Sequence, residues 1–248
     1  MRKTIDIMGV PVDFITAQEA IKIVEAFMGE NVIHTVYTPN SEIMMAAQGD
    51  PYLKDILCQA DLIIADGAGV VLASKILGSG LPERVTGVDL VKNTFLAASK
   101  GKIKFFLLGG QSGIAEIAGE KITDKYPGVE IVGYHNGYFK KEDEATILEK
   151  INSSSADVLL VALGAPKQEI WIHEHKDRLK IRVCMGIGGT LDILACKVPL
   201  APEFFRRNSL EWLYRLYREP WRFKRMLDLP RFILLVLAKR FKQVKRRG

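Results

Sequence analysis

Polar and glycine residues recur where short apolar stretches of this chain end, and their types suit a charged, hydroxyl-rich ligand. Glycines let backbone N–H groups approach a phosphate, amides and hydroxyls hydrogen bond to sugars, and a carboxylate can accept a proton. Turn chemistry alone explains two or three such segments, but six in succession favour a ligand cleft. The six segments are residues 38–40, 66–67, 109–113, 136–137, 164–169 and 188–190.

Asp66 is the candidate for proton transfer, because it directly follows the apolar run LIIA and precedes Gly67. The common role of aspartate at such a position is to cap a helix N-terminus. The alternative role is general base, which near neutral pH requires burial to raise the carboxyl pKa above its usual value of about 3.9. The position alone favours the cap and leaves the second role open.

A glycine-rich loop with Gly109 and Gly110 follows a strand and opens a predicted helix, where N–H groups and the helix dipole favour an anion. An ordinary strand-to-helix turn would use the same residues. A nicotinamide dinucleotide would also call for an acidic residue at the end of the next strand. That strand carries Glu130 near its start and Tyr134 and His135 at its end, so the dinucleotide interpretation is weak and a nucleoside diphosphate stays open.

Pro166 begins another candidate segment, since proline is tolerated in the first turn of a helix. Lys167 and Gln168 then lie among the unbonded N–H groups of that turn, where they could hold a diphosphate or sugar hydroxyls. Glu169 could equally do no more than balance the helix dipole.

Further polar positions have both a structural and a functional interpretation. Asn40 follows Thr38 before a helical run and could be only a helix cap. Arg84 follows a break rich in glycine and proline, where it is either a solvated loop residue or a clamp for a phosphate. A metal site is not expected, because His173 and His175 lie two residues apart on a predicted helix and so point to different sides.

The segments that carry these residues alternate between strands and helices, which predicts an α/β fold with a Rossmann-like, mostly parallel sheet flanked by helices. Strands are expected at residues 4–10, 32–38, 62–65, 103–108, 129–134, 158–163 and 181–187. Helices are expected at residues 17–28, 69–77, 89–98, 114–126, 142–151 and 167–179. The catalytic domain is expected to cover residues 1–200, and residues 201–248 to form a basic, amphipathic helical appendage.

The appendage differs from the sheet domain in charge. Residues 206–248 contain fourteen Lys/Arg and three acidic residues, a net charge of +11, whereas residues 1–205 contain 21 Lys/Arg and 26 Asp/Glu, a net charge of −5. The chain of 248 residues is 48% apolar, enough for a buried core, and its three scattered cysteines fit a reducing cytosol. The longest apolar run near the C-terminus has seven residues, whereas a membrane-spanning helix needs about 20.

A membrane-surface segment is the favoured interpretation of this tail. One helical face is apolar and aromatic, and a second carries arginines, which an anionic leaflet attracts by about 1 kcal/mol each. Pro220 must kink the helix or begin a new one. Nucleic acid is a competing partner. In a third interpretation, the tail packs on the sheet domain and its arginines reach the cleft. The two faces are Leu210, Leu213, Tyr214 and Tyr217, and Arg215, Arg218, Arg222 and Arg225.

Together these motifs resemble those of the WecG/TagA/CpsF glycosyltransferase family over nearly the whole chain. The resemblance implies an inverting, metal-independent transfer of N-acetylmannosamine from its UDP donor to the 4-hydroxyl of N-acetylglucosamine on undecaprenyl diphosphate, the linkage unit of wall teichoic acid, with no cofactor. It also implies a peripheral location on the cytoplasmic membrane face, against an anionic membrane surface rather than nucleic acid. The resembling segments are residues 38–40, 65–67, 84–87, 108–110, 164–169 and 186–190, with the basic appendage.

The resemblance also assigns roles to residues. It makes Asp66 the base, with Thr38 beside it in the catalytic centre, and it directs Arg215, Arg222 and Arg225 to the diphosphate groups. UDP-N-acetylmannosaminuronic acid and UDP-glucose stay open as donors, a nucleotide-sugar epimerase or dehydrogenase is the rival on the same sheet, and a homo-oligomer stays open. The remaining substrate-binding candidates are Asn40, Arg84, Gly109, Gly110, Asn136, Lys167, Gln168, Glu169, Gly188, Gly189, Thr190 and Asp192.

Overall fold

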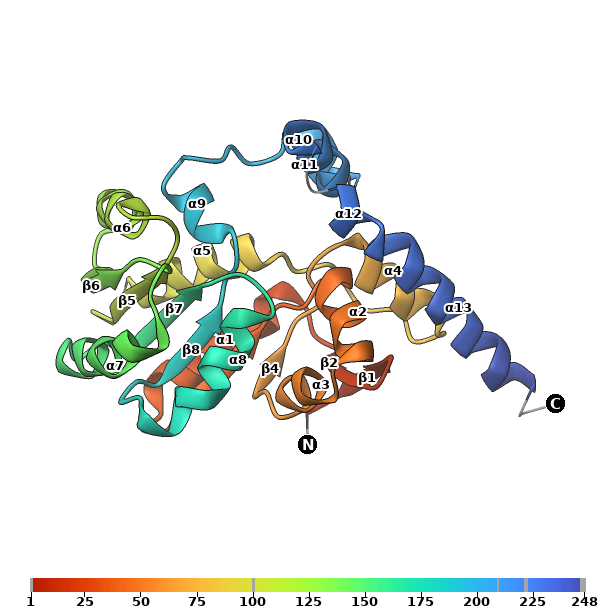
Figure 1. The fold of residues 1–248 in the computed structure, drawn as a ribbon, viewed down its shortest axis with the longest axis horizontal. Coiled ribbons are helices and arrows are strands. Elements are labelled where there is room, and N and C mark those ends of the chain that lie inside the picture. Colours follow the sequence, from red (N-terminus) through yellow and green to blue (C-terminus); the bar gives the residue numbers. More distant parts are fainter. Residues whose placement is uncertain (1, 100, 209, 221–222, 246–248) are drawn as a thin grey trace.

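A parallel six-stranded sheet forms the centre of the computed structural model, which describes residues 2–99, 101–208, 210–220 and 223–245. The strand order is β4-β3-β8-β7-β5-β6, and helices cover both faces (Figure 1). The predicted Rossmann-like α/β fold is confirmed. The strands are β3 (His34–Tyr37), β4 (Leu62–Ile63), β5 (Lys104–Gly109), β6 (Glu130–His135), β7 (Val158–Ala162) and β8 (Val183–Gly186).

The first expected strand is instead an antiparallel hairpin of β1 (Thr4–Ile7) and β2 (Val10–Asp13). Met8 and Gly9 have φ angles of 58° and 88°, the signature of a tight two-residue turn between strands. The carboxylate of Asp13 accepts a hydrogen bond of 2.8 Å from a backbone N–H of β4, so the hairpin is tied to the edge of the main sheet.

Two hydrophobic clusters bury the two faces of the sheet. Helices α1, α5, α6 and α9 cover one face, and α2, α3, α4, α7, α8 and α13 contribute to the other. All six expected helices are present with shifted ends, whereas α2, α3 and α9 were not foreseen. These helices are α1 (Ala17–Gly29), α2 (Ser41–Gly49), α3 (Pro51–Cys58), α4 (Ala68–Ile76), α5 (Gly87–Ala98), α6 (Ile114–Lys125), α7 (Glu144–Ser153), α8 (Lys167–His175) and α9 (Thr190–Leu194), with 3₁₀ turns at Lys141–Asp143 and Lys176–Arg178.

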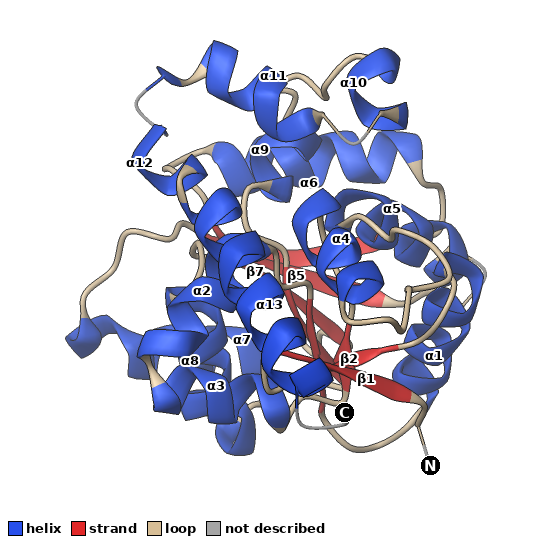
Figure 2. Ribbon diagram, turned by 90° about the vertical axis from the view of Figure 1, so that its right-hand side faces the viewer, coloured by secondary structure: helices blue, strands red, loops and turns tan. Residues whose placement is uncertain are grey.

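The tail consists of short helices above the sheet and one long helix packed beside it. Helix α13 lies between α2 and α4 (Figure 2). Its Phe232 and Val236 are fully buried in the same cluster as residues of the sheet. As expected, the helical path breaks at Pro220, between α11 and α12. None of the described helices combines the length and the apolar character needed to cross a membrane. The tail helices are α10 (Glu203–Arg207), α11 (Glu211–Arg218), α12 (Phe223–Met226) and α13 (Asp228–Lys245).

Candidate functional site

Asp66 and Thr38 converge on the backbone of Gly87, at the start of α5. A Cβ atom on Gly87 would lie 3.0 Å from Thr38 Oγ1 and 3.4 Å from Asp66 Oδ2, and the Asp66 carboxylate accepts a hydrogen bond from the Gly87 N–H. The two side chains approach the same point because they follow β3 and β4, adjacent parallel strands that end at the same edge of the sheet. A hydroxyl and a carboxylate are thereby held side by side, and a side chain at Gly87 would crowd both.

The N-cap interpretation of Asp66 is wrong. Helix α4 begins at Ala68, and its N-cap is Gly67, which has a φ angle of 90° and makes no side-chain cap hydrogen bond. Asn40, in contrast, does cap α2, because its Oδ1 accepts hydrogen bonds of 3.0 and 3.1 Å from the N–H groups of Glu42 and Ile43. The structural interpretation therefore holds for Asn40, whereas Asp66 does not cap α4, the helix that follows it.

The electrostatic surroundings of Asp66 shift the pKa of its carboxyl upward. Burial is the largest influence and raises the pKa of the Asp66 carboxyl, and the nearby carboxylate of Glu211 raises it further. The charges of Arg215 and Arg84 and the Gly87 N–H lower the pKa without cancelling the rise. A raised pKa makes the deprotonated carboxylate a stronger base than an ordinary aspartate.

Arg84 reaches this site from the loop before α5 and pairs with Glu211 of the tail helix α11. Arg84 Nη1 donates to Glu211 Oε2 at 2.9 Å, and Nη2 donates to Oε1 of the same carboxylate. The Arg84 and Glu211 side chains are only 16% and 23% exposed, so the solvated-loop interpretation of Arg84 is wrong. Arg215 lies one turn after Glu211, and its charge acts on Asp66. Helix α11 therefore lies over the site.

Two contributors to this site were not singled out from the sequence. Glu211 precedes Arg215 by four residues, the spacing that places both on one helical face, and this signal could have found it. Gly87 is the last residue of the 84–87 segment, but the sequence assigned it no role. The reason for a glycine there is the close approach of Thr38 and Asp66, which are distant in the sequence. Of the other tail arginines, Arg222 lies outside the described residues, as does the side chain of Arg225 in α12.

The start of α8 has an exposed part and a buried part. Lys167 is exposed, and its Nζ lies 5.1 Å from the centre of the Phe139 ring. Gln168 and Glu169 are 3% and 1% exposed. Gln168 Oε1 accepts a hydrogen bond of 2.9 Å from the N–H of Gly188 in the loop after β8. Gln168 thus joins two predicted ligand-binding segments, and Glu169 lies too deep for direct contact with a ligand.

The loop after β8 turns an open stretch of backbone outward. A Cβ atom on Gly188 or Gly189 would meet no atom within 4 Å. Thr190 is buried at the start of α9, and the backbone carbonyl of Asp192 accepts hydrogen bonds from the chain that follows that helix. Close approach of a ligand is therefore possible along the backbone of Gly188 and Gly189, whereas the buried Thr190 is not available to a ligand.

Gly109 and Gly110, at the end of β5, have a structural explanation. A Cβ on Gly109 would lie 2.3 Å from the backbone oxygen of Ala162, and the Gly110 carbonyl accepts a hydrogen bond of 2.8 Å from Gly137. Asn136 Oδ1 accepts a hydrogen bond of 2.9 Å from a backbone N–H two residues on. The ordinary-turn interpretation thus accounts for these glycines without a phosphate.

The same loops nevertheless flank a small cavity of about 160 Å³ at the far side of the sheet. Strand β6 lies five strand positions from β4, about 24 Å at about 4.8 Å per strand. A small, compact ligand therefore cannot contact both this cavity and Asp66. This cavity can receive only the distant end of an extended ligand. The cavity is lined by residues 111–113, 115, 116, 134–136 and 150.

A resident metal has little support in the part of the chain that the structure describes. No group of three or more His, Cys, Asp or Glu residues is placed there to hold one. His173 and His175 diverge as expected, His173 toward the ring of Tyr52 and His175 toward that of Trp171.

Comparison with known proteins gives a consistent result over almost the whole chain. The model of the glycosyl transferase WecG/TagA/CpsF family matches residues 5–246. A protein of Bacillus spizizenii is 36% identical over 211 residues, 85% of this chain and 81% of its own length, and one of Bacillus subtilis is 35% identical over 211 residues, 85% and 82% of the two chains. A protein of Staphylococcus aureus is 32% identical over 244 residues, 98% of this chain and 95% of its own. All three are named N-acetylglucosaminyldiphosphoundecaprenol N-acetyl-beta-D-mannosaminyltransferase.

Proposed function

Because the chain belongs to the glycosyl transferase WecG/TagA/CpsF family, we propose that it transfers N-acetylmannosamine from UDP-N-acetylmannosamine to the 4-hydroxyl of N-acetylglucosamine on undecaprenyl diphosphate. The names of relatives that are 32% to 36% identical support this choice of sugar and acceptor. The observation that carries the proposal is the convergence of Asp66 and Thr38 at Gly87, under the charges of Arg84 and Arg215. The product would be the disaccharide linkage unit of wall teichoic acid.

In the proposed reaction Asp66 accepts the proton of the acceptor 4-hydroxyl while that oxygen attacks the anomeric carbon of the donor sugar. The new C–O bond forms on the face opposite UDP. The bond from the anomeric carbon to the β-phosphate oxygen breaks, and its electron pair leaves with UDP, so the anomeric configuration inverts. The Thr38 hydroxyl, beside the carboxylate, is placed to hydrogen bond with a sugar hydroxyl and so orient it.

Departure of UDP needs charge stabilisation more than it needs a proton, because a diphosphate is already a good leaving group. Arg215 and Arg84 both act on this site with positive charge, that of Arg84 being partly offset by Glu211. Such preorganised charge is the usual largest contribution to transition-state stabilisation. We therefore propose a reaction that does not depend on a metal ion. The loops after β5 and β6, at the far end of the sheet edge, would receive the nucleoside part of the extended donor.

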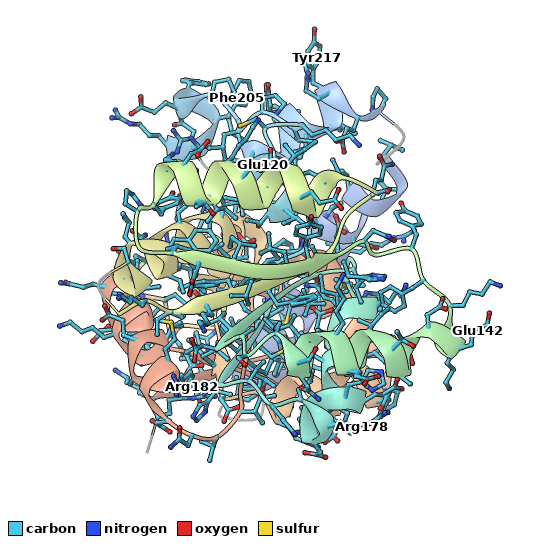
Figure 3. The ribbon with its side chains drawn as sticks, turned by 90° about the vertical axis from the view of Figure 1, so that its left-hand side faces the viewer. Glu120, Glu142, Arg178, Arg182, Phe205 and Tyr217 are labelled. Atoms are coloured by element: carbon cyan, nitrogen blue, oxygen red, sulfur yellow. The ribbon has the colours of Figure 1, made fainter. Side chains whose placement is uncertain are left out.

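The acceptor is carried by a lipid, and the tail suits an anionic membrane surface on the cytoplasmic side. Tyr217 of α11 is 82% exposed and projects outward from the tail (Figure 3). Exposed aromatic and aliphatic side chains among many cations are the composition of an interfacial segment. Among the described residues of the tail, the most exposed apolar ones are Phe204, Leu213, Tyr217, Phe223, Leu234, Leu235 and Phe241.

A product assay tests the proposal directly. The purified chain is incubated with a short-chain lipid diphosphate bearing N-acetylglucosamine and, in parallel, with UDP-N-acetylmannosamine, its uronic acid and UDP-glucose. We expect a disaccharide lipid only or mainly from UDP-N-acetylmannosamine, with inverted anomeric configuration by NMR and undiminished yield in EDTA. Preference for another UDP-sugar would overturn the donor assignment, and loss of product in EDTA would overturn the metal-independent mechanism.

A further inference from the structure

The side-chain amide of Gln168 is held at both ends. Its Nε2 donates to Glu169 Oε1 at 2.8 Å, and its Oε1 accepts from the N–H of Gly188 at 2.9 Å. A flipped amide would place oxygen against carboxylate and NH₂ against N–H, so both hydrogen bonds would be lost. The carboxyl of Glu169 and the N–H of Gly188 together therefore fix which way the Gln168 amide faces.

The amide also lies close against the end of β8. A Cβ atom on Gly186 would lie 3.0 Å from Gln168 Nε2, so the absence of a side chain at Gly186 leaves the space that the amide occupies. The chain of contacts runs from Glu169 through Gln168 to Gly188, and it connects α8 to the open loop after β8. A shift at Glu169 would consequently be transmitted to the backbone of that loop.

A buried carboxyl at this position costs free energy, because it is removed from water. Glu169 is 1% exposed, and among the described residues its Oε2 has no hydrogen-bond partner. Burial raises the pKa of Glu169, although the hydrogen bonds from Gln168 and from its own N–H lower it. An apolar side chain of similar size would avoid this cost, so packing stability does not explain a glutamate here.

We propose that Glu169 is a positioning residue, whose carboxyl orients the Gln168 amide and through it holds the loop of Gly188 and Gly189 for the UDP-sugar. The inference rests on the proposed function and extends it: the backbone of Gly188 and Gly189, which is open to close approach, would bind the donor, and Gln168 would hold that loop in place. Glu169 itself does not touch the substrate. A substitution of Glu169 is therefore expected to weaken donor binding, and only when Gln168 is present.

A double-mutant cycle tests this dependence. Glu169→Leu keeps most of the volume but removes the acceptor, and misplacement of binding groups commonly costs up to about 100-fold. We expect Glu169→Leu to raise the KM for the UDP-sugar about 10-fold or more, with the KM for the lipid acceptor unchanged. In a Gln168→Ala background the same substitution should change the donor KM less than twofold. Glu169→Gln, whose amide oxygen can still accept from Gln168, should stay within about threefold of the wild type.

Equal losses from Glu169→Leu in both backgrounds would overturn the proposal, as would a Glu169→Gln variant as poor as Glu169→Leu. Simple loss of folded protein would lower kcat and leave KM unchanged. Ile172→Val, a fully buried change on the same helix, controls for loosened packing and should leave both constants within about twofold.

Hydrogen exchange at the Gly188 amide gives a readout that needs no activity. We expect protection in the wild type and in Glu169→Gln, and exchange at least about tenfold faster in Glu169→Leu and Gln168→Ala. If the wild type transferred none of the tested sugars, the proposed function would fail. The exchange measurement would still test whether Glu169 acts through Gln168 on Gly188. Unchanged Gly188 exchange in Glu169→Leu would overturn the inference even if the transferase activity were confirmed.

Discussion

Arg84 and Glu211, 127 residues apart in the sequence, form a two-point ion pair that joins the sheet domain to the tail helix α11. One turn after Glu211, Arg215 brings a second positive charge to the Asp66 carboxylate. The pair therefore couples the position of the tail to the charge balance of the candidate base. Tail docking and proton transfer are expected to respond to the same substitutions.

Asp66→Asn should lower turnover by about 10²–10⁴-fold, because an amide cannot accept the proton of the attacking hydroxyl. Initial rates with saturating donor and acceptor measure the loss, and a thermal melt checks that the fold is intact. Asp50→Asn is the matched control, because Asp50 caps α3 and asparagine caps equally well. Near-normal turnover of Asp66→Asn would remove Asp66 from the role of base.

The acidic limb of the pH profile should report the raised pKa of Asp66. The base must be deprotonated, so kcat/KM falls as the pH drops through that pKa, and the midpoint should lie above the ordinary value of about 3.9. Arg215→Gln removes a charge that lowers the pKa and should move the midpoint to higher pH. Arg218→Gln, an equal charge change on the same exposed helix, should leave the midpoint in place. A shift to lower pH in Arg215→Gln would contradict the assignment.

Breaking the ion pair should release the tail. Arg84→Gln and Glu211→Gln should each speed limited proteolysis near α11, with a coupling between them of about 1 kcal/mol in a double-mutant cycle, as suits a partly covered pair. The charge-reversed variant Arg84→Glu/Glu211→Arg should recover protection. Glu203→Gln, which removes an exposed partner of Arg207 in α10, serves as the control. Additive effects of the two single substitutions would show that the pair does not hold α11.

The tail should contribute to the stability of the whole fold. Phe232→Ala removes a fully buried ring and should lower the free energy of unfolding by about 3–5 kcal/mol. Leu234→Ala, two residues on but 66% exposed, should change it by less than about 0.5 kcal/mol. Chemical denaturation of both variants makes the comparison. Equal small effects would mean that α13 is not packed on α2 and α4 in solution.

Membrane attachment should depend on the exposed apolar side chains of the tail. A Tyr217→Ser/Phe241→Ser variant should bind anionic vesicles roughly 30-fold more weakly, because partial burial of each of the two rings contributes on the order of 1 kcal/mol. Co-sedimentation at several salt concentrations measures both the apolar and the charge contribution. Leu96→Ser, which removes a 55% exposed side chain from α5, is the control and should bind like the wild type. Undiminished binding of the tail variant would contradict the assignment of this surface.

The alternation of apolar runs and helical periods was enough to predict the parallel sheet, because that pattern is local. The same reasoning merged the N-terminal hairpin into one strand, since the turn at Met8 and Gly9 carries only a weak local signal. It also left the roles of Asp66 and Asn40 open. Capping is decided by where a helix begins, and α4 begins one residue too late for Asp66 to cap it.

The residues themselves determined the α/β class, the polar strand ends at which we propose the chemistry, and the contrast between an acidic body and a basic tail. Only the tertiary structure decided that Thr38, Asp66 and Gly87 share one point, that Glu211 holds Arg84, and that Phe232 lies in the core. The physical reason is that an amphipathic helix has the same sequence pattern whether its apolar face meets lipid or protein. Which of the two it meets depends on residues far away in the chain. The local hydrophobic periodicity carries no information about those residues.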